Sequence, residues 1–255
     1  MTEPVLERFA LGEGDAAREI AVLRREGDGP TIVWLGGFLS EMTATKATAL
    51  DDWAASAGRA MLRFDYSGHG ASSGRFEDGT IGQWLEDALA AIERYAGEAP
   101  VLVGSSMGGW MALLAARAMA TPPAGIVLIA PAPDFTEDLM WARFSEEARR
   151  AILDEGVYRK PSQYSAEPTP ITRALIEEGR RHLLLGAPIR TRAPVHILQG
   201  MDDPDVPWEH AMRLVERLAE DDVVVTLIKD GDHRLSRDED LARIIEAVDG
   251  IAPRR

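Results

Sequence analysis

The chain of 255 residues contains no cysteine, so disulfide bonds, thiolate metal sites and cysteine nucleophiles are excluded. It has no run approaching the ~18 apolar residues of a membrane-spanning helix, and we expect no membrane span. Lysine and arginine number 28 against 42 acidic residues, which gives a net charge of −14. This charge argues against nucleic acid or an anionic membrane surface as a partner.

Targeting features are also missing from the first twenty residues. The segment MTEPVLERFALGEGDAAREI has neither the basic flank nor the apolar centre of a signal peptide. It carries too many acids for a mitochondrial transit peptide. We therefore predict a cytoplasmic location. Nothing in the sequence predicts an oligomeric state.

What is present is enough apolar sequence, 45%, for a sizeable core. Short aliphatic runs alternate with longer helical patterns, which predicts an α/β fold with a mostly parallel, eight-stranded sheet flanked by helices. The first strands are separated only by loops, which indicates an antiparallel start. The expected strands are Val5–Phe9, Ile20–Leu23, Thr31–Leu35, Ala60–Phe64, Val101–Gly104, Ile126–Ile129, Val195–Leu198 and Val223–Ile228. The expected helices are Ala44–Ala57, Ile81–Ala96, Gly109–Ala120, Trp208–Ala219 and Arg237–Val248.

The alternation stops between residues 131 and 192, where no strand is predicted. Two amphipathic stretches, Phe135–Glu155 and Ile171–Leu185, are joined by Val157–Pro170. We interpret this region as a helical cap inserted into a core made of residues 1–130 and 193–255. A long helical crossover is the alternative.

The most informative motif is Gly104-Ser105-Ser106-Met107-Gly108, which follows a buried strand and precedes a helix. In that context G-x-S-x-G forms a sharp turn that exposes the serine hydroxyl. The glycines remove Cβ atoms that would clash beside the turn. Ser106 is therefore the candidate nucleophile.

A serine nucleophile needs a base, and the base needs an orienting acid, here expected in the chain order Ser, acid, His. His233 follows the last strand in a loop, which makes it the candidate base. Asp203 follows the preceding strand in Gly200-Met-Asp-Asp-Pro-Asp-Val-Pro207 and is the candidate acid. Three other aspartates remain as alternatives for the acid: Asp134, Asp202 and Asp205. The other histidines are His69, His182, His196 and His210.

Two backbone amides are candidates for an oxyanion hole, those of Met107 and of Phe38, the latter after the turn Gly36-Gly37. Phe38, Trp141 and Phe144 are candidates for an acyl pocket, because Trp141 and Phe144 lie three residues apart on an expected helix. Packing of the cap on the core explains the two cap aromatics equally well. Five cap arginines are candidates for binding an anionic leaving group, although solvated helix faces explain them as well: Arg149, Arg150, Arg173, Arg180 and Arg181.

These motifs together resemble the α/β-hydrolase superfamily over about Thr31 to Val248. Leu35-Gly-Gly-Phe38, Arg63-Phe-Asp-Tyr-Ser-Gly-His-Gly-Ala-Ser-Ser-Gly74 and Gly104-Ser-Ser-Met-Gly-Gly-Trp110 are similar to the abhydrolase group of acyl-protein depalmitoylases and acyl-glucuronide esterases. The resemblance implies an α/β-hydrolase fold, with Ser106, Asp203 and His233 as its triad. We expect it to differ from that group in lacking a presequence, and it has Gly36-Gly37 where His-Gly is usual.

The function predicted is hydrolysis of carboxylic esters or thioesters of a small-molecule or acylated substrate through an acyl-enzyme. This chemistry needs no metal and no organic cofactor. Acyl transfer or perhydrolysis by the same triad remains an alternative, and so does a non-catalytic ligand-binding relative. The sequence does not identify the acyl chain or the leaving group.

Overall fold

The computed structural model describes residues 3–161, 167–218 and 220–251. Its centre is an eight-stranded sheet, as predicted, and the strands lie in the order β1-β2-β4-β3-β5-β6-β9-β10. The strands are β1 (Val5–Leu11), β2 (Arg18–Arg25), β3 (Asp28–Leu35), β4 (Arg59–Phe64), β5 (Val101–Ser105), β6 (Gly125–Ile129), β9 (Val195–Gly200) and β10 (Val223–Ile228).

The sheet begins antiparallel and continues parallel. β2 pairs antiparallel with both β1 and β4, whereas every pair from β4 through β3, β5, β6 and β9 to β10 is parallel. The predicted fold class is therefore confirmed. Because the parallel strands end at one edge, the loops that follow β3, β5, β9 and β10 meet there.

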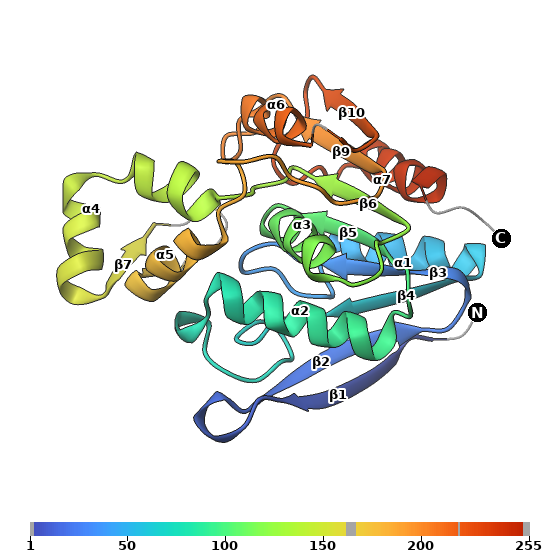
Figure 1. Ribbon diagram of the computed structural model, residues 1–255, viewed down its shortest axis with the longest axis horizontal. Coiled ribbons are helices and arrows are strands. Elements are labelled where there is room, and N and C mark those ends of the chain that lie inside the picture. The colour runs from blue at the N-terminus through green and yellow to red at the C-terminus, as the bar shows by residue number, and fades with distance from the viewer. Residues whose placement is uncertain (1–2, 162–166, 219, 252–255) are drawn as a thin grey trace.

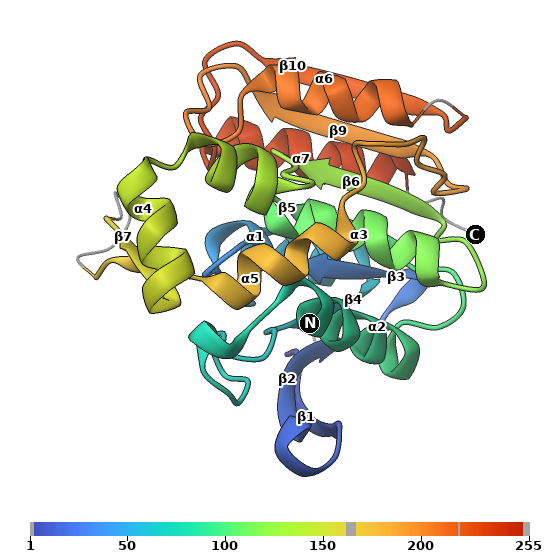
Figure 2. The ribbon, with the colours of Figure 1, turned by 60° about the vertical axis from the view of Figure 1, so that its left-hand side comes forward.

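Helices cover both faces of the sheet, as Figures 1 and 2 show. α2 (Ile81–Tyr95), α3 (Met107–Ala118) and α6 (Trp208–Arg217) pack in one apolar cluster, in which Trp84 and Trp110 are fully buried. α1 (Thr45–Ala57) and α7 (Asp238–Ile251) belong to the cluster on the opposite face. Residues on the central strands are buried from both sides, which is why those strands are continuous aliphatic runs.

The chain between β6 and β9 extends beyond the carboxyl ends of the strands, at the left of Figure 1. It holds α4 (Glu146–Arg150) and α5 (Arg173–Gly179), but also an antiparallel pair, β7 (Val157–Lys160) with β8 (Thr169–Thr172). The expectation of no strand here is wrong, because strands of only four residues, with Ile171 as their one buried residue, are too short to carry a periodic signal. Residues 162–166 of the predicted linker and Ala219 of a predicted helix lie outside the described residues.

The helical part of this region is also less regular than its sequence suggests. π-helical turns occupy Thr136–Met140 and Ala151–Glu155. Short 3₁₀ turns complete the described structure: Gly14–Ala16, Phe76–Asp78, Trp141–Arg143 and Arg180–His182. None of the described helices is long and apolar enough to cross a membrane.

Candidate active site

Ser106 lies at a sharp turn between β5 and α3. Its backbone is held at φ 55° and ψ −116°, a strained conformation for a residue with a side chain. The chain approaches itself closely here: a Cβ on Gly104 would lie 2.2 Å from the Gly108 carbonyl oxygen. A Cβ on Gly108 would lie 1.9 Å from the carbonyl oxygen of Leu35. Only glycine fits at either position, so the local sequence forces the turn that exposes the Ser106 hydroxyl.

His233 connects Ser106 to Asp203. Its Nε2 lies 3.1 Å from Ser106 Oγ, and its Nδ1 lies 2.8 Å from Asp203 Oδ2. The three residues come from the turns after β5, β10 and β9, which end at the same edge of the sheet. The arrangement is that of a hydroxyl, an imidazole and a carboxylate in one hydrogen-bonded line.

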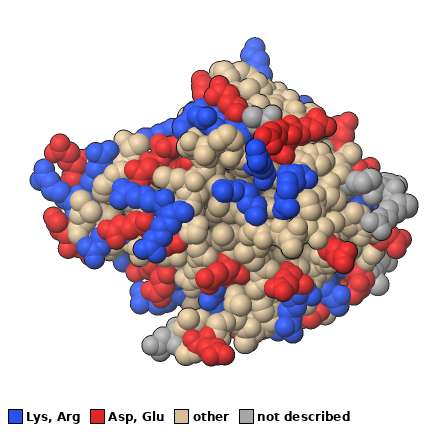
Figure 3. All heavy atoms as spheres, in the orientation of Figure 1, with Lys and Arg blue, Asp and Glu red and all other residues tan. Residues whose placement is uncertain are grey.

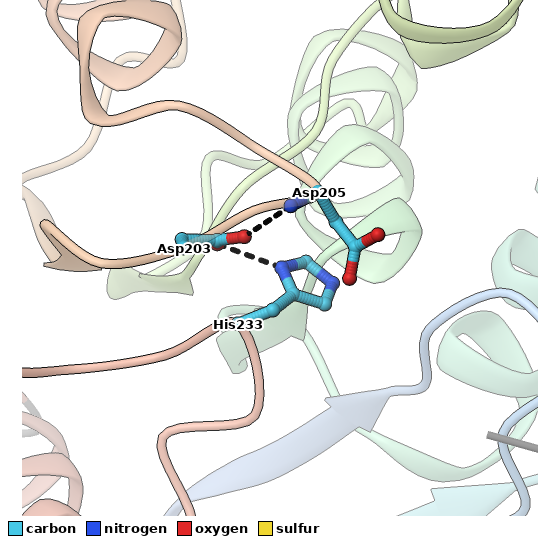
Figure 4. Close-up of side chains that lie close together, drawn as sticks. All are labelled: Asp203, Asp205 and His233. Carbon is cyan, nitrogen blue, oxygen red and sulfur yellow. Dashed lines mark hydrogen bonds and ion pairs between the residues drawn. The ribbon is translucent and has the colours of Figure 1, made fainter. Parts of the chain in front are cut away.

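The Asp203 carboxylate is buried and held by its own loop. Its Oδ1 accepts hydrogen bonds from the amides of Asp205 and Val206, each at 2.8 Å. Figure 4 shows the bond from the Asp205 amide and the ion pair to His233, both made by this carboxylate. Oδ2 also accepts a bond from Gln199 Nε2 at 3.3 Å. With both oxygens acting as acceptors, the imidazole Nδ1 must donate, which leaves Nε2 able to accept a proton from Ser106.

Among the described residues, one cluster has the spacing of a possible metal site: Asp203, Asp205 and His233 (Figure 4). One potential ligand atom of each residue lies within 4.8 Å of those of the other two. Hydrogen bonds already occupy both oxygens of Asp203, and His233 Nδ1 faces one of them. A metal ion would have to displace these contacts. The geometry therefore fits an orienting carboxylate beside an imidazole better than a ligand set.

The loop after β3 brings the Phe38 amide to the turn at Ser106. A Cβ on Gly37 would lie 3.5 Å from Ser106 Cβ, so the two segments touch. Leu39 has a φ of 58°, and its amide donates to His69 Nε2 at 3.3 Å. Over the described chain, neither the Phe38 amide nor the Met107 amide donates a hydrogen bond to another residue. Both donors are available to a ligand beside Ser106.

Asp65 fixes this loop from behind. Its carboxylate accepts hydrogen bonds from the amides of Met42 at 2.6 Å and Ala71 at 2.8 Å. Burial raises the pKa of Asp65 above its ordinary range, partly offset by these two amides. Burial also lowers the pKa of His69, which favours the neutral ring that accepts from Leu39. His69 thus belongs to the support of the loop and not to the line at Ser106.

The alternative acid, Asp134, lies elsewhere. Its carboxylate accepts the amides of Leu184 at 2.7 Å and Leu185 at 2.8 Å, and so fastens the returning end of the region 131–192. Among the other histidines, His210 bonds the Pro133 carbonyl at 2.7 Å. His182 contacts Glu178 at 2.5 Å, and His196 contacts Thr226 at 2.9 Å.

A cavity of about 1150 Å³ opens in front of Ser106. Phe38 and Met107 line it, whereas Trp141 and Phe144 do not. Trp141 lies beneath the guanidinium groups of Arg149 and Arg180, 5.5 and 5.1 Å from its ring, and Phe144 packs on Tyr158. The apolar lining on the side of the region 131–192 comes instead from Phe135, Leu139, Met140 and Ile171.

The cap arginines named from the sequence are also absent from the cavity wall. Arg149 donates to the Trp141 carbonyl, Arg173 donates to the Leu153 carbonyl, and Arg180 pairs with Glu137 at 2.7 Å. Arg150 pairs with Glu146 at 3.2 Å on the exposed face of α4. Figure 3 shows basic and acidic side chains mixed over this part of the surface. These contacts identify most of the cap arginines as structural.

Comparison with known proteins identifies the family that the sequence motifs resemble. A sequence profile of the alpha/beta hydrolase family matches residues 32–247. The human (Homo sapiens) protein named palmitoyl-protein thioesterase ABHD10, mitochondrial, is 36% identical over 233 residues, which cover 91% of this chain and 76% of that protein. The mouse (Mus musculus) protein of the same name is 36% identical, with coverage of 91% and 78%.

Solved structures agree over nearly the whole chain. A putative hydrolase from Agrobacterium vitis S4 superposes with a TM-score of 0.96 at 48% identity, covering 99% of this chain and all of that one. Mouse alpha/beta hydrolase domain-containing protein 10 gives a TM-score of 0.86 at 34% identity, with coverage of 96% and 98%. Est1E from Butyrivibrio proteoclasticus, at 21% identity and a TM-score of 0.72, shares the fold.

The same comparison overturns the predicted location. The curated relatives from human, mouse and cattle (Bos taurus) are all named as mitochondrial, so the prediction of a cytoplasmic protein is wrong. The reason is physical: organelle targeting is read from separate segments, and the composition of a folded domain does not report its compartment.

Proposed function

The chain belongs to the alpha/beta hydrolase family and is a hydrolase of esters or thioesters, and we propose that Ser106, His233 and Asp203 carry out its reaction. The observation that supports this proposal most directly is the hydrogen-bonded line from Asp203 Oδ2 through His233 to Ser106 Oγ. Each member comes from a different loop; Ser106 and His233 line the cavity, and the buried Asp203 contacts His233.

In the proposed mechanism, Ser106 Oγ attacks the acyl carbonyl while His233 Nε2 takes its proton. Asp203 keeps Nδ1 protonated and stabilises the imidazolium that forms. His233 then gives the proton to the leaving oxygen or sulfur, and the acyl group stays on Ser106 as an ester. A water molecule, deprotonated by His233, attacks that ester and releases the acid.

The oxyanion of each tetrahedral intermediate is assigned to the amides of Phe38 and Met107. Both amides are free of acceptors in the described chain and flank the Ser106 turn. The Met107 amide is also the first of α3, where the helix dipole favours negative charge. His69 and Asp65 contribute indirectly by fixing the loop that carries Phe38.

We propose that residues 131–192 act as a cap domain and that the substrate is an acyl thioester with a long aliphatic chain. The cap contributes Phe135, Leu139, Met140 and Ile171 to the cavity. The volume of about 1150 Å³ exceeds the range of roughly 300–1,000 Å³ usual for drug-sized ligands. The names of the curated relatives, palmitoyl-protein thioesterases, support the same substrate class.

The test is labelling by a fluorophosphonate probe together with hydrolysis of acyl thioesters from two to sixteen carbons. The wild-type protein should be labelled, and Ser106→Ala should lose both labelling and at least about a thousandfold in kcat with an unchanged melting temperature. Ser105→Ala removes the neighbouring hydroxyl from β5 and should retain labelling. Labelling of Ser106→Ala, or failure to label the wild type, would refute the assignment of the nucleophile.

A further inference from the structure

Charged residues of both signs also line the cavity: Lys46, Arg75, Lys160 and Arg234 are basic, and Glu77, Glu167 and Asp205 are acidic. Lys46 in the first turn of α1 and Arg234 in the His233 loop both line the cavity. Three hydroxyl-bearing residues line it too: Ser40, Thr45 and Ser236. The cavity therefore combines apolar side chains from residues 131–192 with polar and cationic side chains from α1 and the His233 loop.

The two cations lack acidic partners. Across the described residues, neither Lys46 nor Arg234 lies within 4.0 Å of a carboxylate oxygen. Two charged groups act on the pKa of Lys46: Arg234, which repels the ammonium and lowers the pKa, and Asp232, which raises it. The Asp232 carboxylate is already bonded to the amides of Arg234 and Leu235, at 3.1 and 3.0 Å. An anion between the two side chains would relieve their repulsion.

Lys46 also has hydrogen-bond donors to spare. An ammonium group carries three N–H donors, and Nζ donates one of them to the Arg234 carbonyl oxygen. Among the described residues, this is the one hydrogen bond that the Lys46 side chain makes. Burial and Arg234 lower the pKa of Lys46 to about 8, so the group is still largely charged at neutral pH. Donors that face a cavity and have no acceptor of their own in the described chain are suited to an anionic ligand.

The position of this pair decides which part of a substrate it would meet. Arg234 directly follows His233, whose Nε2 must reach the leaving atom to return its proton. The acyl chain has its own apolar wall on the cap side. Arg234 and, through its contact with the Arg234 carbonyl, Lys46 thus lie next to the residue that would protonate the leaving group, in a chain whose net charge of −14 otherwise disfavours anions.

We propose that Lys46 and Arg234 form a subsite for a carboxylate or phosphate carried by the leaving group of the substrate. This inference rests on the proposed function, because it assumes that the acyl group is transferred to Ser106. It makes the leaving group, in addition to the acyl chain, a determinant of specificity.

The experiment compares two matched pairs of thioesters that carry the same octanoyl chain. One pair is S-octanoyl-4′-phosphopantetheine and S-octanoyl-pantetheine, which differ by one phosphate. The other is the thioester of 3-mercaptopropionate and that of 3-mercaptopropionamide, which differ by one carboxylate. In the wild type, kcat/KM for the anionic member of at least one pair should exceed that of the neutral member by on the order of tenfold, and salt should reduce the ratio.

Lys46→Met and Arg234→Met should each bring this ratio close to one, whereas Lys46→Arg should retain it. Lys229→Met removes an equal charge from an exposed position outside the cavity and should leave the ratio unchanged. Arg234→Met keeps the backbone carbonyl that Lys46 contacts, so any effect of this variant comes from loss of the Arg234 charge and not from loss of that contact. The pair that responds identifies the anion as phosphate or carboxylate.

Equal rates for both members of both pairs in the wild type would overturn the subsite while leaving the proposed function intact. Loss of kcat/KM by the same factor on anionic and neutral thioesters in both Met variants would also overturn it, and would assign Lys46 and Arg234 to support of the His233 loop. Absence of hydrolysis of all four thioesters would refute the proposed function, and the subsite with it.

Discussion

Replacing Asp203 with asparagine tests the proposed mechanism most sharply, because the structure predicts which way the new amide will face. Asp203 Oδ1 accepts two loop amides at 2.8 Å, and the asparagine oxygen can keep both bonds. The NH₂ group must then take the place of Oδ2, 2.8 Å from His233 Nδ1. A donor there forces Nδ1 to accept, so the proton moves to Nε2 and the imidazole can no longer take the proton of Ser106.

We expect Asp203→Asn to lower kcat by about 10⁴, or roughly 5 kcal/mol of transition-state stabilisation, with little change in KM. The assay is steady-state hydrolysis of an octanoyl thioester, beside thermal unfolding of each variant. The two loop bonds survive and the bond from Gln199 Nε2 to Oδ2 is lost, so the melting temperature should fall only by the amount expected for one hydrogen bond.

Asp134→Asn is the matched control. Its carboxylate holds the amides of Leu184 and Leu185 and not an imidazole, so an asparagine can keep one bond and loses the other. This variant should lose about 1–3 kcal/mol of stability and keep kcat within a few-fold. If instead Asp134→Asn abolishes turnover and Asp203→Asn is mild, the assignment of the acid is refuted.

Two further predictions concern the cavity. Met140→Ala should reduce kcat/KM for palmitoyl thioesters about tenfold more than for acetyl thioesters, because Met140 lines the cavity and each buried methylene is worth about 0.8 kcal/mol. Trp141→Ala, outside the cavity, should affect both chain lengths equally, and the reverse pattern in a chain-length series would place the acyl pocket at Trp141. Since the pKa of Lys46 is about 8, its ammonium loses charge as pH rises through 8, whereas Arg234 stays charged, so the preference for anionic leaving groups should fall between pH 7 and 9. The measurement is the ratio of kcat/KM for the anionic and the neutral thioester, in the wild type and in Lys46→Met. A wild-type ratio that stays constant over this range would contradict a role for the Lys46 charge.

Local sequence patterns were sufficient to predict the central sheet and the turn at Ser106. The aliphatic runs of β3, β5 and β6 are buried on both faces, so their composition marks them as central strands. The turn at Ser106 depends on glycines within two residues of it, which makes it readable from the sequence alone. Chain order then singled out His233 from the other histidines, because parallel strands bring their carboxyl ends to one edge.

Other features depended on contacts between distant segments. Asp134 and Asp203 both follow strands, and only the folded chain shows that one meets the Leu184 amide and the other His233. The expectation that Trp141 and Phe144 share a face assumed α-helical geometry, but a π-helical turn over Thr136–Met140 and a 3₁₀ turn after it change their directions. Lys46 and Arg234 lie 188 residues apart and carry no common motif, so the sequence determined their charge while only the packing of α1 against the His233 loop decided that the two charges face one cavity.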